Sequence, residues 1–258
     1  MAKVKRWVVK AGSKMVLDGG PLLMRAWMQQ VAALRKHHNI EVIWVTSGAI
    51  AWAAQKTNFK SIKRTLPQKQ ALSAIGQPLI MDQYNLALAA TNLLGSQVLL
   101  TAADIVDKTR KKNLKNTLQQ LLKWQVIPIL NENDAVATEE IKFGDNDSLA
   151  AKVAVMMKAD KLILMTDVDG LFDADPNTNL KATLIPYRKK LAVADLRLAN
   201  PKAKSKVGTG GMYSKLLAAQ KANQSKVVTY FVRGDWPKNL MQIAEGLPVG
   251  TQIGGRRA

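Results

Sequence analysis

Two glycine-containing segments place a lysine beside flexible backbone, a combination that suits phosphate binding. Lys10 ends an apolar run and is followed closely by Gly12. The second segment, Gly208–Lys215, is rich in glycine and leads into an amphipathic stretch. Glycine lets backbone N–H groups approach an anion, and a helix N-terminus adds partial positive charge. We therefore predict that Lys10 and Lys215 face a transferring phosphoryl group. The alternatives are a strand-end lysine in solvent and an ordinary helix cap.

Acidic and amide side chains gather near the middle of the chain. Asp134 follows an apolar run, and the sequence Gly144–Asp147 carries three such side chains in succession. Carboxylates can bind an amine, orient lysines or help to place magnesium. The alternative is helix capping by Asn146 or Asp147, although this run exceeds what a cap requires.

Small polar residues follow two further apolar runs. Ser47 and Gly48 open a predicted helix whose N–H groups could hold a carboxylate or a phosphate. Thr166 and Asp167 come directly after the run 161–165, where an aspartate can hold a ribose hydroxyl or a base edge. An N-cap and a pair of β-turns are the respective alternatives.

The apolar pattern predicts a scaffold that brings these strand ends together. Short apolar runs alternate with longer amphipathic stretches, which is typical of α/β layers. The predicted strands are Trp7–Lys10, Val42–Val45, Gly95–Leu100, Val126–Leu130, Lys161–Met165 and Val227–Val232. The predicted helices are Pro21–His37, Gln68–Thr91, Asn113–Trp124, Ser148–Met157 and Tyr213–Asn223. Continuous apolar strands indicate a parallel sheet covered on both faces, whose ligands lie beyond the carboxyl ends of the strands. Residues 173–205 are predicted to form an excursion from this sheet.

The composition excludes several classes of protein. The 258 residues are 47% hydrophobic and 22% charged, which is enough for a sizeable core and excludes a disordered chain. Cysteine is absent, so disulfide scaffolds, zinc ribbons and cysteine nucleophiles are excluded. No apolar run approaches the roughly 20 residues of a membrane span, and Lys10 interrupts the N-terminal apolar stretch. We therefore expect a cytoplasmic protein without a secretory signal or membrane partner.

The charge is strongly positive, with 38 basic and 19 acidic residues and a formal net charge of +19. Such a charge attracts polyanions, including nucleic acid. The basic residues are spread along the whole chain, however, and aromatic residues make up only 5%. Because that leaves little surface for base stacking, we favour a solvated basic surface over a nucleic-acid site. The six tryptophans are predicted to pack in the core or at interfaces.

Taken together, these segments resemble the amino acid kinase family over nearly the whole chain. The opening strand with Gly12, the run Thr46–Ile50, and the segments around Thr166 and Lys215 are similar to its phosphate and ATP loops. Asn131–Val136 followed by Gly144–Asp147 is more specific, because it resembles the members that phosphorylate glutamate.

The resemblance implies a fold, an activity and a set of site residues. The fold would be a three-layer α/β sandwich with an open, mostly parallel central sheet. The activity would be ATP- and Mg²⁺-dependent phosphorylation of the γ-carboxylate of L-glutamate, the first step of proline biosynthesis. The implied catalytic residues are Lys10, Lys215 and Asp147, the last orienting the lysines. The implied glutamate-binding residues are Ser47, Gly48, Asp134 and Asn146. The implied ATP-binding residues are Lys10, Gly12, Thr166, Asp167, Thr209, Gly210, Gly211, Met212, Tyr213, Ser214 and Lys215.

The resemblance also implies a domain organisation and partners. We expect residues 1–258 to form one kinase domain, with the glutamate site in its N-terminal part and the ATP site in its C-terminal part. We expect no C-terminal RNA-modification-type (PUA) domain, and a homo-oligomer, either a dimer or a tetramer. The protein ligands of the metal are left open. The alternatives are a kinase of this fold with another carboxylate or phosphate acceptor, and a nucleic-acid-binding protein built on this fold.

Overall fold

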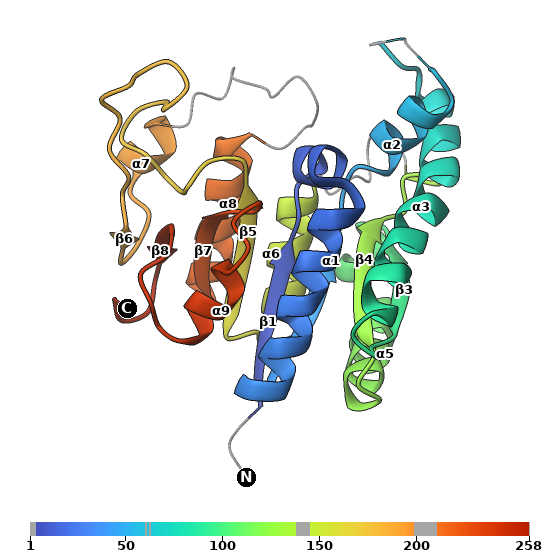
Figure 1. Cartoon of the computed structure of the whole chain (residues 1–258), viewed down its shortest axis with the longest axis horizontal. Helices are drawn as coiled ribbons and strands as arrows, with labels where there is room; N and C mark the ends of the chain where they lie inside the picture. The colour runs from blue at the N-terminus through green and yellow to red at the C-terminus, as the bar shows by residue number, and fades with distance from the viewer. Residues whose placement is uncertain (1–3, 60, 62, 138–144, 199–210, 258) are drawn as a thin grey trace.

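A computed structural model of the chain describes residues 4–59, 61, 63–137, 145–198 and 211–257 (Figure 1). Within these residues the strands form one eight-stranded sheet of order β3-β4-β2-β1-β5-β7-β8-β6. The strands are β1 (Lys5–Lys10), β2 (Ile40–Val45), β3 (Gly95–Leu100), β4 (Ile127–Glu132), β5 (Lys161–Thr166), β6 (Tyr187–Arg188), β7 (Val228–Arg233) and β8 (Thr251–Ile253).

All neighbouring strands from β3 to β7 pair in parallel. Only β8 runs antiparallel to its neighbour β7, and β6 then pairs parallel to β8. The carboxyl ends of six strands therefore meet at one edge of the sheet, at the top of Figure 1. We call it the carboxyl edge, and the opposite edge the amino edge.

Helices cover both faces of the sheet, so the predicted three-layer α/β sandwich is confirmed. One face carries α1 (Ser13–His38), α3 (Leu66–Ala89) and α9 (Asn239–Ala244), and the other carries α5 (Lys108–Lys123), α6 (Asn146–Met156) and α8 (Met212–Gln224). The shorter helices are α2 (Ala49–Lys56), α4 (Ala103–Val106) and α7 (Val193–Leu198). Within the described residues, every helix is too short or too polar to cross a lipid bilayer.

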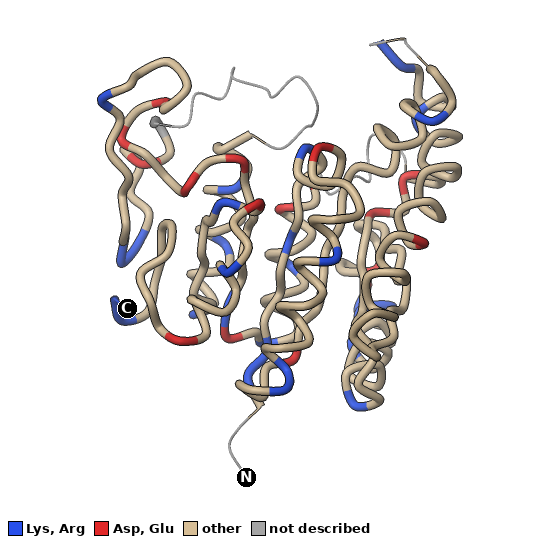
Figure 2. Tube along the Cα trace, in the orientation of Figure 1, with Lys and Arg blue, Asp and Glu red and all other residues tan. Residues whose placement is uncertain are grey.

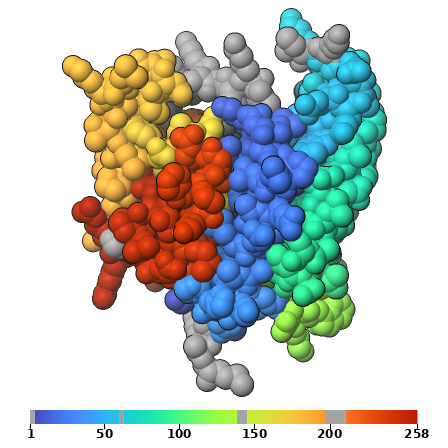
Figure 3. Space-filling model, viewed as in Figure 1, coloured from blue at the N-terminus to red at the C-terminus, as the bar shows by residue number. Residues whose placement is uncertain are grey.

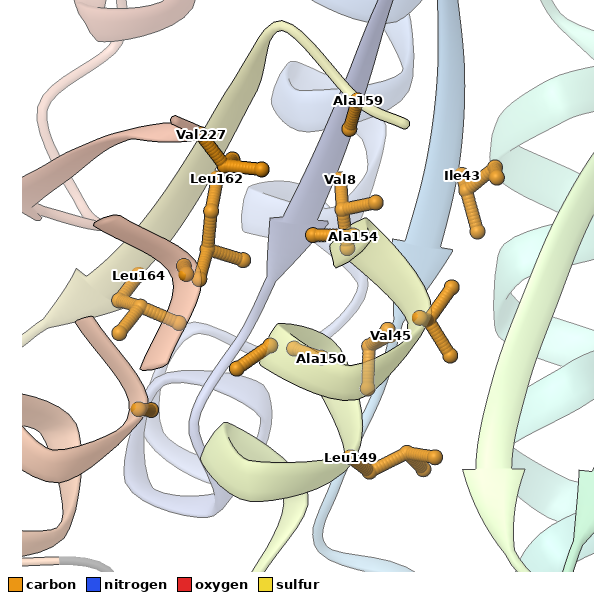
Figure 4. Packing of buried hydrophobic residues seen from close by; sticks show 14 of the residues in the cluster. Val8, Ile43, Val45, Leu149, Ala150, Ala154, Ala159, Leu162, Leu164 and Val227 are labelled. Atoms are coloured by element: carbon orange, nitrogen blue, oxygen red, sulfur yellow. The ribbon is translucent and has the colours of Figure 1, made fainter. Parts of the chain in front are cut away.

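Strand alternation assigns each apolar side chain to one of two cores. On β1, Trp7 and Val9 face the α1 side, whereas Val8 faces the α6 side. Figure 4 shows Val8 beside Ala154 of α6, with Ala150 further along the same helix, and these small side chains let the helix lie close to the sheet. The N-terminal segment lies between the C-terminal region and the α2–α3 region in the space-filling view (Figure 3).

Several predicted boundaries need correction. The first helix begins at Ser13 rather than Pro21, because α1 continues through a kink at Gly20, where φ is +53°. The sequence pattern missed β6, β8 and α9. The predicted excursion still contributes to the sheet through β6. Its stretch 199–205 lies outside the described residues. The packing role of the tryptophans holds for Trp7, Trp27 and Trp44, whereas Trp124 and Trp236 are exposed.

Candidate active site

The carboxyl edge holds a buried carboxylate between two lysines. Asp147 is completely buried, and its Oδ1 lies 2.8 Å from Lys10 Nζ. Its Oδ2 lies 3.0 Å from Lys215 Nζ. Both lysines are themselves at least nine-tenths buried. The structure therefore brings the three predicted catalytic residues into one cluster, which we call the ionic cluster and which carries a net charge of +1.

The charged groups of this cluster shift one another's pKa values. Burial raises the pKa of the Asp147 carboxyl, but the charges of Lys10 and Lys215 outweigh burial, and the pKa lies well below its ordinary value. Burial lowers the pKa of Lys10 from its ordinary value, against the opposing effect of Asp147. Asp147 is therefore ionised at every physiological pH and cannot serve as a proton acceptor.

Three elements position the ionic cluster. Lys10 is the last residue of β1, and Lys215 lies in the first turn of α8. Asp147 lies in the first turn of α6, whose N-cap is Asp145, and the Asp145 carboxylate accepts a hydrogen bond from Ser148 N at 2.8 Å. The suggestion that Asn146 or Asp147 caps this helix is thus wrong. Because Asp145 makes the cap, both following side chains can serve the site.

A second buried network, made of neutral amides, lies beside the ionic cluster. The Nδ2 group of Asn146 donates to Thr46 O at 2.8 Å, to Ser47 Oγ at 2.9 Å and to Asn131 Oδ1 at 2.7 Å. Asn131 Nδ2 donates in turn to Gln77 Oε1 at 2.8 Å. We call Gln77, Asn131 and Asn146 the amide chain. It joins β4, α3 and α6, and it brings the predicted substrate residues Ser47 and Asn146 together.

One backbone group fixes the orientation of every amide in this chain. The N–H of Glu132 donates to Asn131 Oδ1 at 2.9 Å, so Asn131 can present only its Nδ2 to Gln77. The same oxygen requires Asn146 to present its Nδ2. Within the described residues, Gln77 Nε2 and Asn146 Oδ1 are left buried without hydrogen-bond partners. They are one donor and one acceptor, which complement the carboxylate and the ammonium of an amino acid.

Two glycines, Gly48 and Gly12, lie beside these networks, and different physical reasons account for glycine at the two positions. Gly48 precedes α2 with φ +97°, a conformation that residues with a side chain rarely adopt. Gly12 has an ordinary φ of −73°, and a Cβ there would meet only ordinary contacts, 3.7 Å from Met165 O and 3.8 Å from Lys10 Nζ. Neither backbone strain nor packing therefore requires glycine at position 12. The remaining explanation is that a side chain here would obstruct the approach of a ligand.

The predicted ATP residues occupy β5 and the start of α8. Thr166 ends β5, and Thr166 Oγ1 donates to the next residue, Asp167, at 3.2 Å. Asp167 also pairs with the exposed Lys14 at 2.8 Å. Gly211 precedes α8 as its N-cap. Met212 and Tyr213 begin that helix, and Thr209 and Gly210 lie outside the described residues.

One further residue links the ATP segment to the ionic cluster. Ser214 Oγ donates to Gly211 O at 2.9 Å and lies 3.4 Å from Asp147 Oδ2. The first turn of α8 therefore contacts Asp147 through both Ser214 and Lys215. Asp134 is half-buried in the turn that follows β4.

Two buried residues of the site did not emerge as candidates from the sequence. Gln77 and Asn131 belong to segments with the family's pattern, but nothing in their spacing shows that they meet. For Asn131, the position of a polar side chain at the end of an apolar strand was a signal that could have identified it as a site residue. Gln77 lies inside a long helix, where a buried glutamine cannot be distinguished from an exposed one by periodicity of this sequence alone.

The described residues contain no group of three or more acidic, histidine or cysteine side chains that could hold a metal ion. Asp147 cannot contribute free oxygens, because each of its two oxygens faces a lysine. A metal cage made by the protein alone is therefore not built from this part of the chain.

The chain is similar to known proteins over most of its length. The model of the amino acid kinase family matches residues 5–234. The chain is 44% identical over 253 residues to a glutamate 5-kinase of Meiothermus ruber, covering 97% of this chain and 66% of the relative. It is 42% identical to a glutamate 5-kinase of Thermus thermophilus, covering 98% of this chain and 68% of the relative. It is 40% identical to that of Burkholderia multivorans, covering 70% of the relative. The chain thus spans about two thirds of the length of these relatives.

Solved structures show the same fold at low sequence identity. An isopentenyl phosphate kinase of T. acidophilum superposes with a TM-score of 0.63 at 15% identity, covering 96% of this chain and 99% of the other. A second isopentenyl phosphate kinase structure gives a TM-score of 0.64 at 16% identity. The fold, the sheet order and the match over residues 5–234 lead to one conclusion. The chain belongs to the amino acid kinase family, and within that family it is similar to the glutamate 5-kinases.

Proposed function

We propose that this protein is a glutamate 5-kinase, which transfers the γ-phosphoryl group of ATP to the γ-carboxylate of L-glutamate. The product would be L-glutamyl 5-phosphate, the first intermediate of proline biosynthesis. The observation that carries the proposal is the pairing of two networks at one strand edge, a cationic cluster beside a neutral amide chain. The similarity to glutamate 5-kinases at 40–44% identity supports the choice of glutamate as the acceptor.

The acceptor would lie over the amide chain. Ser47, Gly48, Asp134 and Asn146 are the proposed glutamate-binding residues. Asn146 Oδ1 is a buried acceptor that suits the substrate ammonium, and Gln77 Nε2 is a buried donor that suits a carboxylate. Because the amide chain is neutral, it would bind the two carboxylates of the substrate less tightly than a cationic surface would. The γ-carboxylate could then point toward the ionic cluster.

The nucleotide would lie across β5 and α8. The proposed ATP-binding residues that the structure describes are Lys10, Gly12, Thr166, Asp167 and the run Gly211–Lys215; Thr209 and Gly210 complete the loop in sequence. The N-terminus of α8 aims partial positive charge toward the phosphates. We propose one kinase domain for residues 1–258, with the acceptor bound on the β2–β4 side and ATP on the β5–β7 side.

The chemical step needs charge neutralisation more than proton transfer. A carboxylate oxygen of glutamate attacks the γ-phosphorus, and the bond from that phosphorus to the ADP oxygen breaks. The γ-carboxyl is already ionised at neutral pH, so no general base is required. Lys10 and Lys215 stabilise the charge that spreads over the phosphoryl oxygens in the transition state. Asp147 keeps both ammonium groups in place without neutralising them fully.

We propose that Mg²⁺ is carried into the site by the phosphates of ATP rather than held by a protein cage. The two lysine-bound oxygens of Asp147 and the lack of a ligand cluster in the described residues support this view. When bound, the ion would shield the negative charges of the phosphates from the incoming carboxylate. We also propose a cytoplasmic homo-oligomer, a dimer or a tetramer, which light scattering on the purified protein would measure.

The test is a coupled assay for ADP release with ATP, Mg²⁺ and L-glutamate, with hydroxylamine present to trap the acyl phosphate as a hydroxamate. We expect release that depends on glutamate and a matching yield of hydroxamate. Reactions with L-aspartate and with isopentenyl phosphate test other acceptors. A folded protein that releases ADP faster with either of these compounds than with glutamate would overturn the proposal.

A further inference from the structure

The amino edge of the sheet contains an open cavity of about 720 Å³ that the proposed kinase reaction does not use. It lies where β1, β5 and β7 begin, between the C-terminal ends of α6 and α8. Its cationic lining residues are Lys5, Lys158, Lys161 and Lys226, and its one acidic lining residue is Asp160. We call it the amino-edge cavity. Parallel strands separate it from the ionic cluster by the full length of β1.

Two of these lysines occupy a backbone conformation that disfavours them. Lys158 and Lys226 follow the ends of α6 and α8 with φ of +51° and +63°. Helices commonly end on a left-handed residue, which is usually glycine and sometimes asparagine. Of the six described residues other than glycine with positive φ, three are asparagines and one is Gln125. The remaining two are these lysines, and both line the same cavity.

A third lysine is held in place by aromatic rings. Lys161 Nζ lies 5.0 Å from the ring centroid of Trp7 and 4.9 Å from that of Tyr230. It donates one hydrogen bond to Ile243 O at 3.1 Å. An ammonium has three donors, so this single bond leaves hydrogen-bonding capacity. Burial, followed by the charge of Lys5, lowers the pKa of Lys161 to about 8.

The cavity has little negative charge of its own. The Asp160 carboxylate accepts a hydrogen bond from Arg6 N at 2.7 Å, so one of its oxygens is already engaged. Within the described residues, none of the four lysines forms an ion pair closer than 4.0 Å. Four cations facing one carboxylate leave an excess positive charge of three.

The floor of the cavity is apolar, which adds a second requirement on the ligand. Its apolar lining residues are Trp7, Val155, Ala159, Val227 and Val228. A volume of this size accommodates a small organic molecule rather than a single ion. The rim would bind an anionic group and the floor would bind a compact apolar body.

We propose that the amino-edge cavity is a second ligand site, which binds a small organic phosphate by its phosphate group at Lys158, Lys161 and Lys226. The strained backbone at two of the lysines is retained because the side chains meet the ligand. The proposal is independent of the kinase activity, since the cavity shares no residue with the ionic cluster or the amide chain.

Residue-resolved lysine acylation, read by mass spectrometry, tests the proposal without relying on activity. The probes are phenyl phosphate and inorganic phosphate, and sodium chloride at equal ionic strength is the control. At a probe concentration about ten times its Kd, we expect phenyl phosphate to slow the labelling of all three lysines about tenfold. Inorganic phosphate should protect them less, and Lys36 and Lys123 should be unaffected. Equal protection by chloride, or protection of Lys10 and Lys215 alone, would overturn the proposal.

Matched variants separate ligand binding from backbone strain. In the Lys158→Gly/Lys226→Gly variant, we expect a higher Tm without ligand and loss of the Tm rise that phenyl phosphate gives the parent protein. Gln125→Gly relieves strain of the same kind outside the cavity and should keep the ligand-induced rise. Lys111→Gln/Lys112→Gln removes two exposed charges elsewhere and should also keep it. A double glycine variant that retains the full ligand-induced rise would show that these lysines do not bind the phosphate.

Discussion

Two consecutive residues divide the candidate active site into two unlike halves. Asp147 holds the charged ionic cluster together, whereas its neighbour Asn146 joins the neutral amide chain. Both lie in the first turn of α6, and both are fixed by contacts no longer than 3.0 Å. The charged half faces β1 and α8, and the neutral half faces β2, β4 and α3. The comparison teaches that one helix turn can hold two lysines on one side and a chain of amides on the other.

The largest effect is expected from removing the charge at the centre of the ionic cluster. Asp147→Asn leaves two buried ammonium groups facing each other without a carboxylate. We expect a loss of about 3–5 kcal/mol in the free energy of unfolding. We also expect kcat to fall about 10³-fold, because the lysines no longer hold their positions. Urea unfolding and steady-state kinetics measure the two effects.

The matched control is Asp235→Asn, since Asp235 pairs with Arg233 at the surface. Its cost should stay below about 1 kcal/mol. If Asp147→Asn cost no more than this control, the ionic cluster would not hold the site together.

Removing one lysine should separate catalysis from stability. Lys10→Met leaves Asp147 and Lys215 as a neutral pair, so we expect the free energy of unfolding to change by less than about 2 kcal/mol. One cation that stabilises the phosphoryl group is lost, and kcat should fall about 10²–10³-fold. The KM for glutamate should change little. Unimpaired kcat in Lys10→Met would remove this residue from the chemical step.

Breaking the amide chain should affect binding of the acceptor rather than turnover. In Asn131→Ala the orientations of Gln77 and Asn146 are no longer fixed by the Glu132 N–H group. We expect the KM for glutamate to rise about tenfold, which corresponds to about 1.4 kcal/mol, with kcat and the KM for ATP nearly unchanged. Asn177→Ala, in an exposed turn, is the control and should leave all three constants alone. An equal fall in kcat without a change in KM would assign the amide chain to the transition state instead.

The smallest effect concerns pH. Because the pKa of Lys10 is lowered, kcat should begin to fall on the alkaline side at a pH below the ordinary lysine value of 10.5. In the same window the unfolded chain binds more protons than the folded one, so the contribution of Lys10 to stability rises with pH.

For Asp147 the contribution to stability also rises with pH, but at the acid end. Its pKa is depressed, so its contribution is present above the ordinary value of 3.8 and is lost as the pH falls through the lower value. Urea unfolding of the parent protein across pH checks the two stability statements, and alkaline kcat profiles of the parent protein and of Lys10→Arg check the statement on activity. An alkaline limb that does not move in Lys10→Arg would contradict the assignment to Lys10.

The sequence was sufficient to predict six of the eight strands in the described residues, because those strands are apolar and bounded by polar residues. The strand Gly95–Leu100 is confirmed residue by residue. The C-terminal strand Thr251–Ile253 was missed, because three residues are too few to show a period. The first helix was predicted to start at Pro21 instead of Ser13, because the turn before the kink at Gly20 was not recognised as helix.

The site was predictable only as a set of residue types. Lys10 at a strand end and Lys215 near a helix start indicated phosphate chemistry. In the structure both lysines pair with the carboxylate of Asp147. The contact from Asn131 to Gln77 spans 54 positions, so no local pattern encodes it. The amino-edge cavity was equally hidden, because the left-handed backbone at its lysines is a property of two helix ends. Figure 2 shows Lys and Arg distributed over the chain, so charge alone does not single out this cavity.

One residue of β8 connects distant parts of the nucleotide side. Thr251 Oγ1 accepts a hydrogen bond from Leu171 N at 2.8 Å and donates one to Ile185 O at 2.6 Å. It thereby fastens both ends of the loop that leaves β5. A ribosome makes β1 to β4 and α6 long before it reaches Thr251. The residues of the proposed acceptor site are therefore made early, whereas the loop after β5, on the proposed ATP side, gains its bonds to Thr251 only when β8 has been synthesised.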